Sequence, residues 1–111
     1  MIEKTILDYL NDNGIMTYME RPPQPPEEYV LLEKTSSSTK DMITTSTFAI
    51  QSYASTLYKA SLLNEQVKEI MNRADTLVDV SSSSLNTDYN YTNTAAKQYR
   101  YQAVYEITHK E

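Results

Sequence analysis

The sequence predicts an α/β (α+β) domain in which two helices pack on one face of a mostly antiparallel or mixed sheet of about five strands. Apolar residues recur every three or four positions in two segments, 2–12 and 54–73, which is the period of an amphipathic helix. Elsewhere apolar and polar residues alternate, and the short gaps between these segments favour antiparallel neighbours. The predicted order is α-β-β-β-α-β-β, within a single domain that covers residues 1–111.

The first third of the chain predicts a helix followed by two strands. The apolar stripe of the first helix consists of Ile2, Ile6, Tyr9 and Leu10. Gly14 suits the left-handed conformation that ends many helices. Residues 15–20 and 29–35 alternate as strands do, and the short gap between them predicts an antiparallel hairpin. All four prolines lie in 21–26, so this segment is predicted to be a stiff connector outside the sheet.

The middle of the chain predicts a polar turn, a strand and the long helix. Residues 36–41 are polar and form the expected turn, and 42–51 alternate as a third strand with Met42, Phe48 and Ile50 in step. Ser52 is the predicted N-cap of the long helix, because its hydroxyl can accept a free backbone N–H. The apolar stripe of this helix comprises Leu57, Ala60, Leu63, Val67, Ile70, Met71 and Ala74.

The last third predicts two more strands, at 77–84 and 99–108. Between them, residues 85–96 are rich in Asn, Thr and Tyr and form a loop, a strand extension, or both in turn. Tyr99, Tyr101 and Tyr105 share one face of the final strand. This tyrosine stripe either faces the helices as part of the core or presents its hydroxyls to a neighbouring protein.

Charge and composition exclude several classes of protein. Fifteen acidic residues against ten basic ones give a formal charge of −5, and the bases are scattered, unlike the basic stripe of a nucleic-acid-binding protein. The chain has no cysteine, which excludes disulfides and thiolate metal sites. No apolar run approaches the ~20 residues that cross a membrane, and the first residues lack the pattern of a signal peptide. We therefore expect a soluble protein made in the cytoplasm.

The residues also predict no catalytic site, metal or cofactor. Phosphate-binding loops need several glycines, and this chain has one. A histidine-based triad would need His109, the single histidine, which lies near the chain end and is expected to be exposed. Glu33 and Lys34 are adjacent and point to opposite faces of a strand, so they cannot share a metal as nuclease residues do. The chain is therefore predicted not to be an enzyme.

Two polar segments are the candidate surfaces for binding another subunit or partner. A proline-rich loop is pre-organised and loses little entropy on binding, and long polar loops in small domains tend to be functional or disordered. The candidate interface residues are Arg21, Pro22, Pro23, Gln24, Pro25, Pro26, Glu27, Glu28, Asn86, Asp88, Tyr89 and Tyr91. Each segment also has a simpler interpretation, as a rigid hairpin connection and as an ordinary loop.

Four segments resemble a known family. They are MTYMERP at 16–22, PEEYVLLEKT at 26–35, FAIQSYA at 48–54 and RYQAVY at 100–105. Together they resemble the tail-terminator (tail-to-head joining, tail completion) proteins of siphophages and prophages of Gram-positive bacteria. The resemblance covers nearly the whole chain, and its motifs are structural.

The resemblance implies a virion subunit without catalytic residues. Such a subunit forms a hexameric ring with itself, caps the major tail tube protein, ends tail polymerisation and joins the tail to the head completion or connector protein. DNA passes through only as cargo, no membrane is involved, and an acidic channel would keep the genome from adhering. The alternatives are a head-completion adaptor or stopper, a minor tail protein, or a small acidic inhibitor that binds proteins by mimicking nucleic acid.

Overall fold

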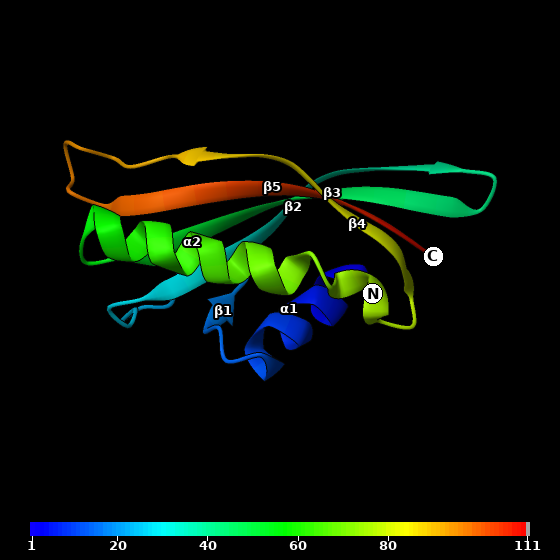
Figure 1. Ribbon diagram of the computed structural model, residues 1–111, viewed down its shortest axis with the longest axis horizontal. Helices are drawn as coiled ribbons and strands as arrows, with labels where there is room; N and C mark the ends of the chain where they lie inside the picture. The colour runs from blue at the N-terminus through cyan, green and yellow to red at the C-terminus, as the bar shows by residue number, and fades with distance from the viewer. Residues whose placement is uncertain (111) are drawn as a thin grey trace.

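A computed structural model describes residues 1–110 and shows a five-stranded mixed sheet with the strand order β1-β2-β3-β5-β4. The predicted fold class and the order of helices and strands are confirmed (Figure 1). The elements are α1 (Ile2–Asp12), β1 (Thr17–Tyr18), β2 (Tyr29–Lys40), β3 (Ile43–Ala54), α2 (Leu57–Met71), the 3₁₀ turn η1 (Ala74–Thr76), β4 (Val80–Asn90) and β5 (Tyr99–Lys110).

Both helices cover the same face of the sheet and leave the other face open (Figure 1). Ile6 and Leu10 of α1 and Val67 of α2 are buried against Phe48 and Ile50 of β3 in one core cluster. α1 ends as predicted, because Gly14 has a φ of +85° and the Ile15 N–H donates to the Leu10 carbonyl at 3.0 Å. None of the helices within residues 1–110 has the length and apolar character needed to cross a membrane.

The expected antiparallel hairpin between the first two strands is wrong. β1 runs parallel to β2, with Thr17 opposite Val30 and Tyr18 opposite Leu31. The connector at 19–28 carries the chain back before β2 begins, so both strands start from the same end of the sheet. The prolines of the connector lie outside the strands, as predicted.

The first hairpin of the chain, β2–β3, is longer than the sequence suggested, and the predicted turn at 36–41 is wrong. Ser36 to Lys40 pair with β3, and the chain turns at Asp41 and Met42, which have φ angles of 54° and 68°. This pair of positive φ angles is typical of the tight hairpin turns whose twist matches that of the strands. Met42 is therefore exposed at the tip of the hairpin and does not join Phe48 and Ile50 in the core.

The expected N-cap of α2 is also wrong. β3 continues to Ala54, and Ser52 is a buried residue of that strand. Thr56 caps the helix instead, because its Oγ1 accepts a hydrogen bond from the Lys59 N–H at 3.1 Å. The helix is shorter at both ends than the apolar periodicity predicted.

His109 is buried, contrary to the expectation of an exposed terminal histidine. Its exposed fraction is 6%, because β5 continues to Lys110 and pairs with both β3 and β4. Nδ1 lies 2.8 Å from the Lys110 carbonyl oxygen, and Nε2 lies 2.8 Å from Ser46 Oγ. Since a carbonyl only accepts, Nδ1 carries a proton and donates it to Lys110, and Nε2 shares the second hydrogen bond with the Ser46 hydroxyl. The pair satisfies two buried polar side chains in the sheet.

Candidate protein-binding surface

A row of aromatic side chains and one arginine crosses the open face of the sheet at one end. It starts on β1 and reaches the end of β4 and the residue after it, and consists of Tyr18, Tyr29, Tyr53, Arg100, Tyr91 and Tyr89. We call these six residues the aromatic row. Cross-strand neighbours on one face of a sheet come within contact distance, and the register of the strands produces this row.

Three tyrosines form the first half of the row. Tyr18 meets the edge of Tyr29, with ring centroids 6.4 Å apart and planes at 70°. Tyr29 and Tyr53 face each other across β2 and β3, and their rings are stacked at 4.7 Å and 2°. Both of these rings are buried, and burial raises the pKa of the Tyr29 hydroxyl. These three rings pack against one another, and little of Tyr29 or Tyr53 is accessible to solvent.

Arg100 joins the tyrosines of both halves. Its Nη1 donates to Tyr53 Oη at 2.9 Å, and its Nε donates to the Tyr91 carbonyl at 2.7 Å. The guanidinium lies 4.4 Å from the centre of the Tyr91 ring and 5.6 Å from that of Tyr53, within the range of cation–π attraction. Tyr91 in turn meets Tyr89 edge to face at 5.9 Å. One side chain therefore fixes the geometry across β3, β5 and the end of β4.

Two glutamines fix the hydroxyl groups of the row. Tyr53 Oη donates to Gln51 Oε1 at 3.1 Å, and Gln51 Nε2 donates to Gln102 Oε1 at 2.8 Å. Gln102 Nε2 then donates to the Tyr89 hydroxyl. The rings of Tyr89 and Tyr91 remain 41% and 42% exposed. The row therefore has a satisfied centre and offers two large, held rings to solvent.

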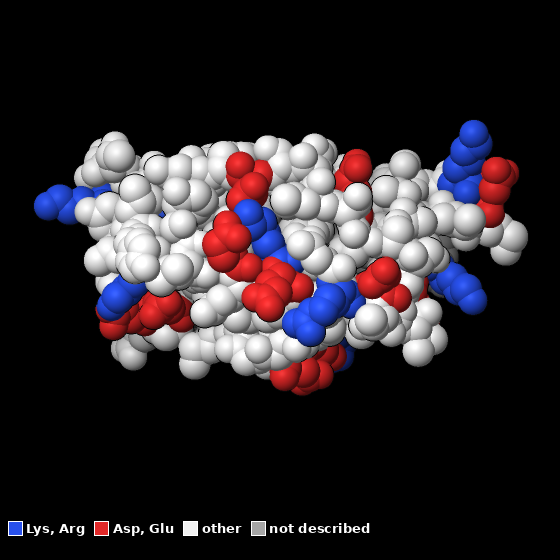
Figure 2. Space-filling model, in the orientation of Figure 1, with Lys and Arg blue, Asp and Glu red and all other residues white. Residues whose placement is uncertain are grey.

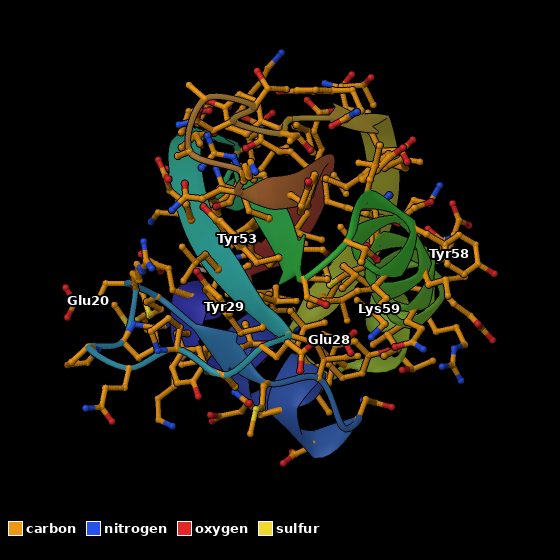
Figure 3. All side chains as sticks on the ribbon, turned by 90° about the vertical axis from the view of Figure 1, so that its left-hand side faces the viewer. Glu20, Glu28, Tyr29, Tyr53, Tyr58 and Lys59 are labelled. Atoms are coloured by element: carbon orange, nitrogen blue, oxygen red, sulfur yellow. The ribbon has the colours of Figure 1, made fainter. Side chains whose placement is uncertain are left out.

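The proline connector borders the row, as Figure 3 shows from this end of the molecule. In that view Tyr29 and Tyr53 lie near the centre, Glu20 of the connector lies to one side, and Tyr58 of α2 lies to the other. The predicted interface residues Pro22, Pro25 and Pro26 are half-buried, and the others in this segment are exposed, namely Arg21, Pro23, Gln24, Glu27 and Glu28. Lys59 of α2 approaches Glu27 at 4.0 Å.

The structure divides the predicted interface residues on β4 between different surfaces. Tyr89 and Tyr91 belong to the aromatic row, so this part of the second segment lies at the same end of the sheet as the connector. Asn86 is exposed beside an irregularity in the pairing of β4. Asp88 points to the opposite face and binds α2. The sequence did not reveal that Tyr53 and Arg100 meet. The register between strands decides which residues are neighbours, and the sequence shows only which residues share one face of a single strand.

Asp88 is the centre of a polar cluster between β4 and α2. Its Oδ2 accepts hydrogen bonds from Lys68 Nζ and Asn64 Nδ2, both at 2.9 Å, and Lys68 also lies 2.8 Å from Glu65. The Lys68 ammonium lowers the pKa of the Asp88 carboxyl, while the carboxylates of Glu65 and Asp88 raise the pKa of Lys68. The cluster links β4 to α2 through hydrogen bonds and an ion pair.

Tyr105 extends this cluster into the core. Its hydroxyl donates to Asn72 Oδ1 at 2.7 Å and lies 3.2 Å from the Lys68 carbonyl. Burial raises the pKa of Tyr105 to about 12. For this residue of the tyrosine stripe, the core interpretation is therefore confirmed.

Asp88→Asn is expected to lower the free energy of unfolding by about 1–2 kcal/mol at neutral pH. The folded pKa of Asp88 lies below its unfolded value, so the stabilisation is present above the unfolded pKa, near 4, and is lost as pH falls through the folded pKa. The variant should therefore lose less stability than the wild type on acidification from about pH 5 to 2. Urea unfolding at several pH values measures both effects. The exposed carboxylate variant Glu33→Gln is the matched control, and equal acid dependence in Asp88→Asn and wild type would contradict the assignment.

Charged side chains of both signs are mixed on the face that carries α2 (Figure 2). Within residues 1–110, no three His, Cys, Asp or Glu side chains gather closely enough to hold a metal ion. The arrangement offers rigid aromatic rings, one held guanidinium and a proline-stiffened rim, which are features of a surface for protein contact. No protein-family model and no curated protein sequence matches this chain.

Proposed function

We propose that this chain is a structural, protein-binding subunit of a phage tail. It acts as a tail terminator: a hexameric ring of the subunit caps the tail tube, ends its polymerisation and joins it to the head connector. The aromatic row is the observation that carries the protein-binding part of this proposal. The resemblance of segments 16–22, 26–35, 48–54 and 100–105 to tail-terminator proteins supplies the place in the virion.

The chemistry of the row fits a binding surface. Tyrosine and arginine are enriched where interfaces carry most of their binding energy, since a large ring with few rotatable bonds loses little entropy on binding. In this chain Arg100 is already held by Tyr53 and Tyr91, so little further order is needed when a partner docks. Tyr89 and Tyr91 extend from this support into solvent and are the contact residues that we propose.

The proline connector and two methionines form the rim of the row. The connector at 21–28 is stiffened by its prolines, so its shape is set before contact. Met16, just before β1, and Met19, the first residue of the connector, are about half exposed. Methionine side chains adapt to irregular partner surfaces. A rigid centre, a stiff connector and two adaptable methionines suit docking on an assembled protein such as the end of a tail tube.

The net charge agrees with DNA passing through the ring without binding. The formal charge of −5 repels a polyanion at long range, and repulsion keeps a channel from retaining its cargo. DNA is therefore proposed as cargo, and proteins as the partners.

A phage that lacks this protein provides the test. We expect tails of abnormal, mostly excessive length and heads without tails in electron micrographs, because nothing ends polymerisation or prepares the tail for the head. Supplying the wild-type chain from a plasmid should restore normal virions. Normal-length tails that fail to join heads would assign the chain to the adaptor or stopper class instead. Normal virions in its absence would remove it from tail assembly altogether.

A further inference from the structure

The sheet has two long free edges. Among the strands of residues 1–110, none pairs with the outer edge of β4, and β1 covers the outer edge of β2 only at Val30 and Leu31. Most of the rest of β2 and of β4 therefore presents backbone N–H and C=O groups without a partner strand along one side, although the Val80 N–H donates to the Leu77 carbonyl. Such groups bind another strand readily, which makes a free edge either a protected surface or an interface.

One part of each edge is little protected. Residues 36–40 on β2 run regularly from an irregularity in the strand pairing to the hairpin tip, residues 82–85 on β4 run regularly between two irregularities, and we call them the two edge segments. Neither contains a proline, and their only charged residue is Lys40, at the hairpin tip. Their side chains are exposed except for that of Ser83, whose hydroxyl donates to the Met71 carbonyl at 2.6 Å. Natural proteins usually protect such edges with charged residues, proline or β-bulges, and in this chain the irregularities of the strand pairing lie outside the two segments.

The two edge segments lie at the same level of the sheet. Ser38 is opposite Thr45, Thr45 is opposite Thr108, and Thr108 is opposite Ser82. The hydroxyls of Thr45 and Thr108 are 3.3 Å apart, which places this line of residues on one face. A second copy moved sideways by the width of the sheet would bring its Ser38 beside Ser82 of the first.

The strand directions also match. β2, β3, β5 and β4 alternate in direction, because each pairs antiparallel with its neighbour in that order. A β2 edge placed next to β4, with the helices of both copies on the same side, is therefore antiparallel as well. It continues the existing pattern of the sheet without reversing any layer.

We infer that the β4 edge segment of one copy pairs antiparallel with the β2 edge segment of the next copy. This inference rests on the proposed function in one respect: a ring subunit needs two different surfaces that fit each other. Contacts between different surfaces of identical chains build rings when the rotation closes. The aromatic row lies at the other end of the strands, around Tyr29, Tyr53 and Tyr91, so this pairing leaves it free for another protein.

Cysteine crosslinking tests the pairing directly. The chain has no cysteine, so the double variant Ser38→Cys/Ser82→Cys carries only the two introduced thiols. Within one chain these positions are three strand spacings apart, about 14 Å, well beyond the ~7 Å between Cα atoms that a disulfide allows. Mild oxidation of the purified full chain should therefore give a ladder of disulfide-linked multimers. The variants Ser38→Cys, Ser82→Cys and Thr45→Cys/Ser82→Cys are the matched controls and should give no disulfide-linked multimers.

The outcomes separate the alternatives. A double variant that remains monomeric overturns the inference, and so do dimers of either single variant, which would show pairing of like edges. As a second measurement, Ser38→Glu/Ser82→Glu should lose multimers in light scattering and Ser38→Lys/Ser82→Glu should regain them, because exposed charges seldom disturb a fold. If the phage lacking this protein has abnormal tails but the double variant gives no ladder, the proposed function stands and the strand pairing is wrong. If the double variant gives a ladder but the phage has normal tails, the pairing stands and the proposed function is wrong.

Discussion

Replacing Leu63 with Asp is expected to lower the free energy of unfolding by about 3–5 kcal/mol. Leu63 lies on the inner stripe of α2 and is 8% exposed within the core cluster that includes Val67 and Ile70. A carboxylate at this position loses its hydration and finds no cation in the apolar cluster. Urea or thermal unfolding followed by circular dichroism measures the loss, which is a large part of the stability of a domain of this size.

The neighbouring residue provides the control. Leu62 is on the same helix and 45% exposed, so Leu62→Asp changes charge and helix propensity in the same way without burying the carboxylate. We expect it to change the free energy of unfolding by less than about 1 kcal/mol. Equal losses in the two variants would show that α2 does not pack with this face on the sheet.

Arg100→Ala is expected to weaken binding to the tail tube by about 30-fold or more, which corresponds to about 2 kcal/mol. The variant loses the hydrogen bonds to Tyr53 and Tyr91 and both cation–π contacts, so the exposed rings of Tyr89 and Tyr91 lose their support. The free energy of unfolding should fall by about 1–2 kcal/mol from the same contacts. Sedimentation with purified tail tubes measures the binding, and urea unfolding measures the stability.

Two variants distinguish the loss of support for the tyrosine rings from the loss of a positive charge. Arg100→Lys keeps the positive charge but lacks the planar fork that reaches Tyr53 and Tyr91 together, so it should bind nearly as poorly as Arg100→Ala. Lys97→Ala removes an exposed cation from the turn just before β5 and should bind as the wild type does. Wild-type binding by Arg100→Ala would exclude the aromatic row as the docking surface.

The fold was predictable where one short-range signal decides the structure. The spacing of Ile2, Ile6 and Leu10 fixed the buried stripe of α1, and Gly14 marked its end. Where the composition of a segment does not define its structure, the pairing between strands decides it. Residues 36–41 consist of Ser, Thr, Lys and Asp, a composition common in turns, yet most of them extend β2 because β3 runs beside them. A chain of hydroxyl residues does not reveal whether it has a partner strand.

The candidate surface was predictable in part, for the same reason. Prolines and a long Asn/Thr/Tyr segment pointed to 21–28 and 85–96, and the structure brings Tyr89 and Tyr91 to the same end of the sheet as the connector. Arg100 and Tyr53 carried no local signal, because a single arginine or tyrosine is common in strands whose polar and apolar residues alternate. Their meeting depends on the register Tyr53 opposite Arg100, and register is set by the whole sheet.

The position of β5 has a consequence for synthesis of the protein on the ribosome. β5 is the last strand in sequence but lies between β3 and β4, so β4 has no partner until Tyr99–Lys110 has emerged. Paired residues of β3 and β5 are between 45 positions (Ala54 and Tyr99) and 67 positions (Ile43 and Lys110) apart in sequence, and such distant pairing slows folding. Nascent chains should therefore expose the serine-rich strand and the apolar side of α2 until translation of β5 is complete. Chaperones that bind exposed apolar segments would meet this chain between the synthesis of α2 and that of β5.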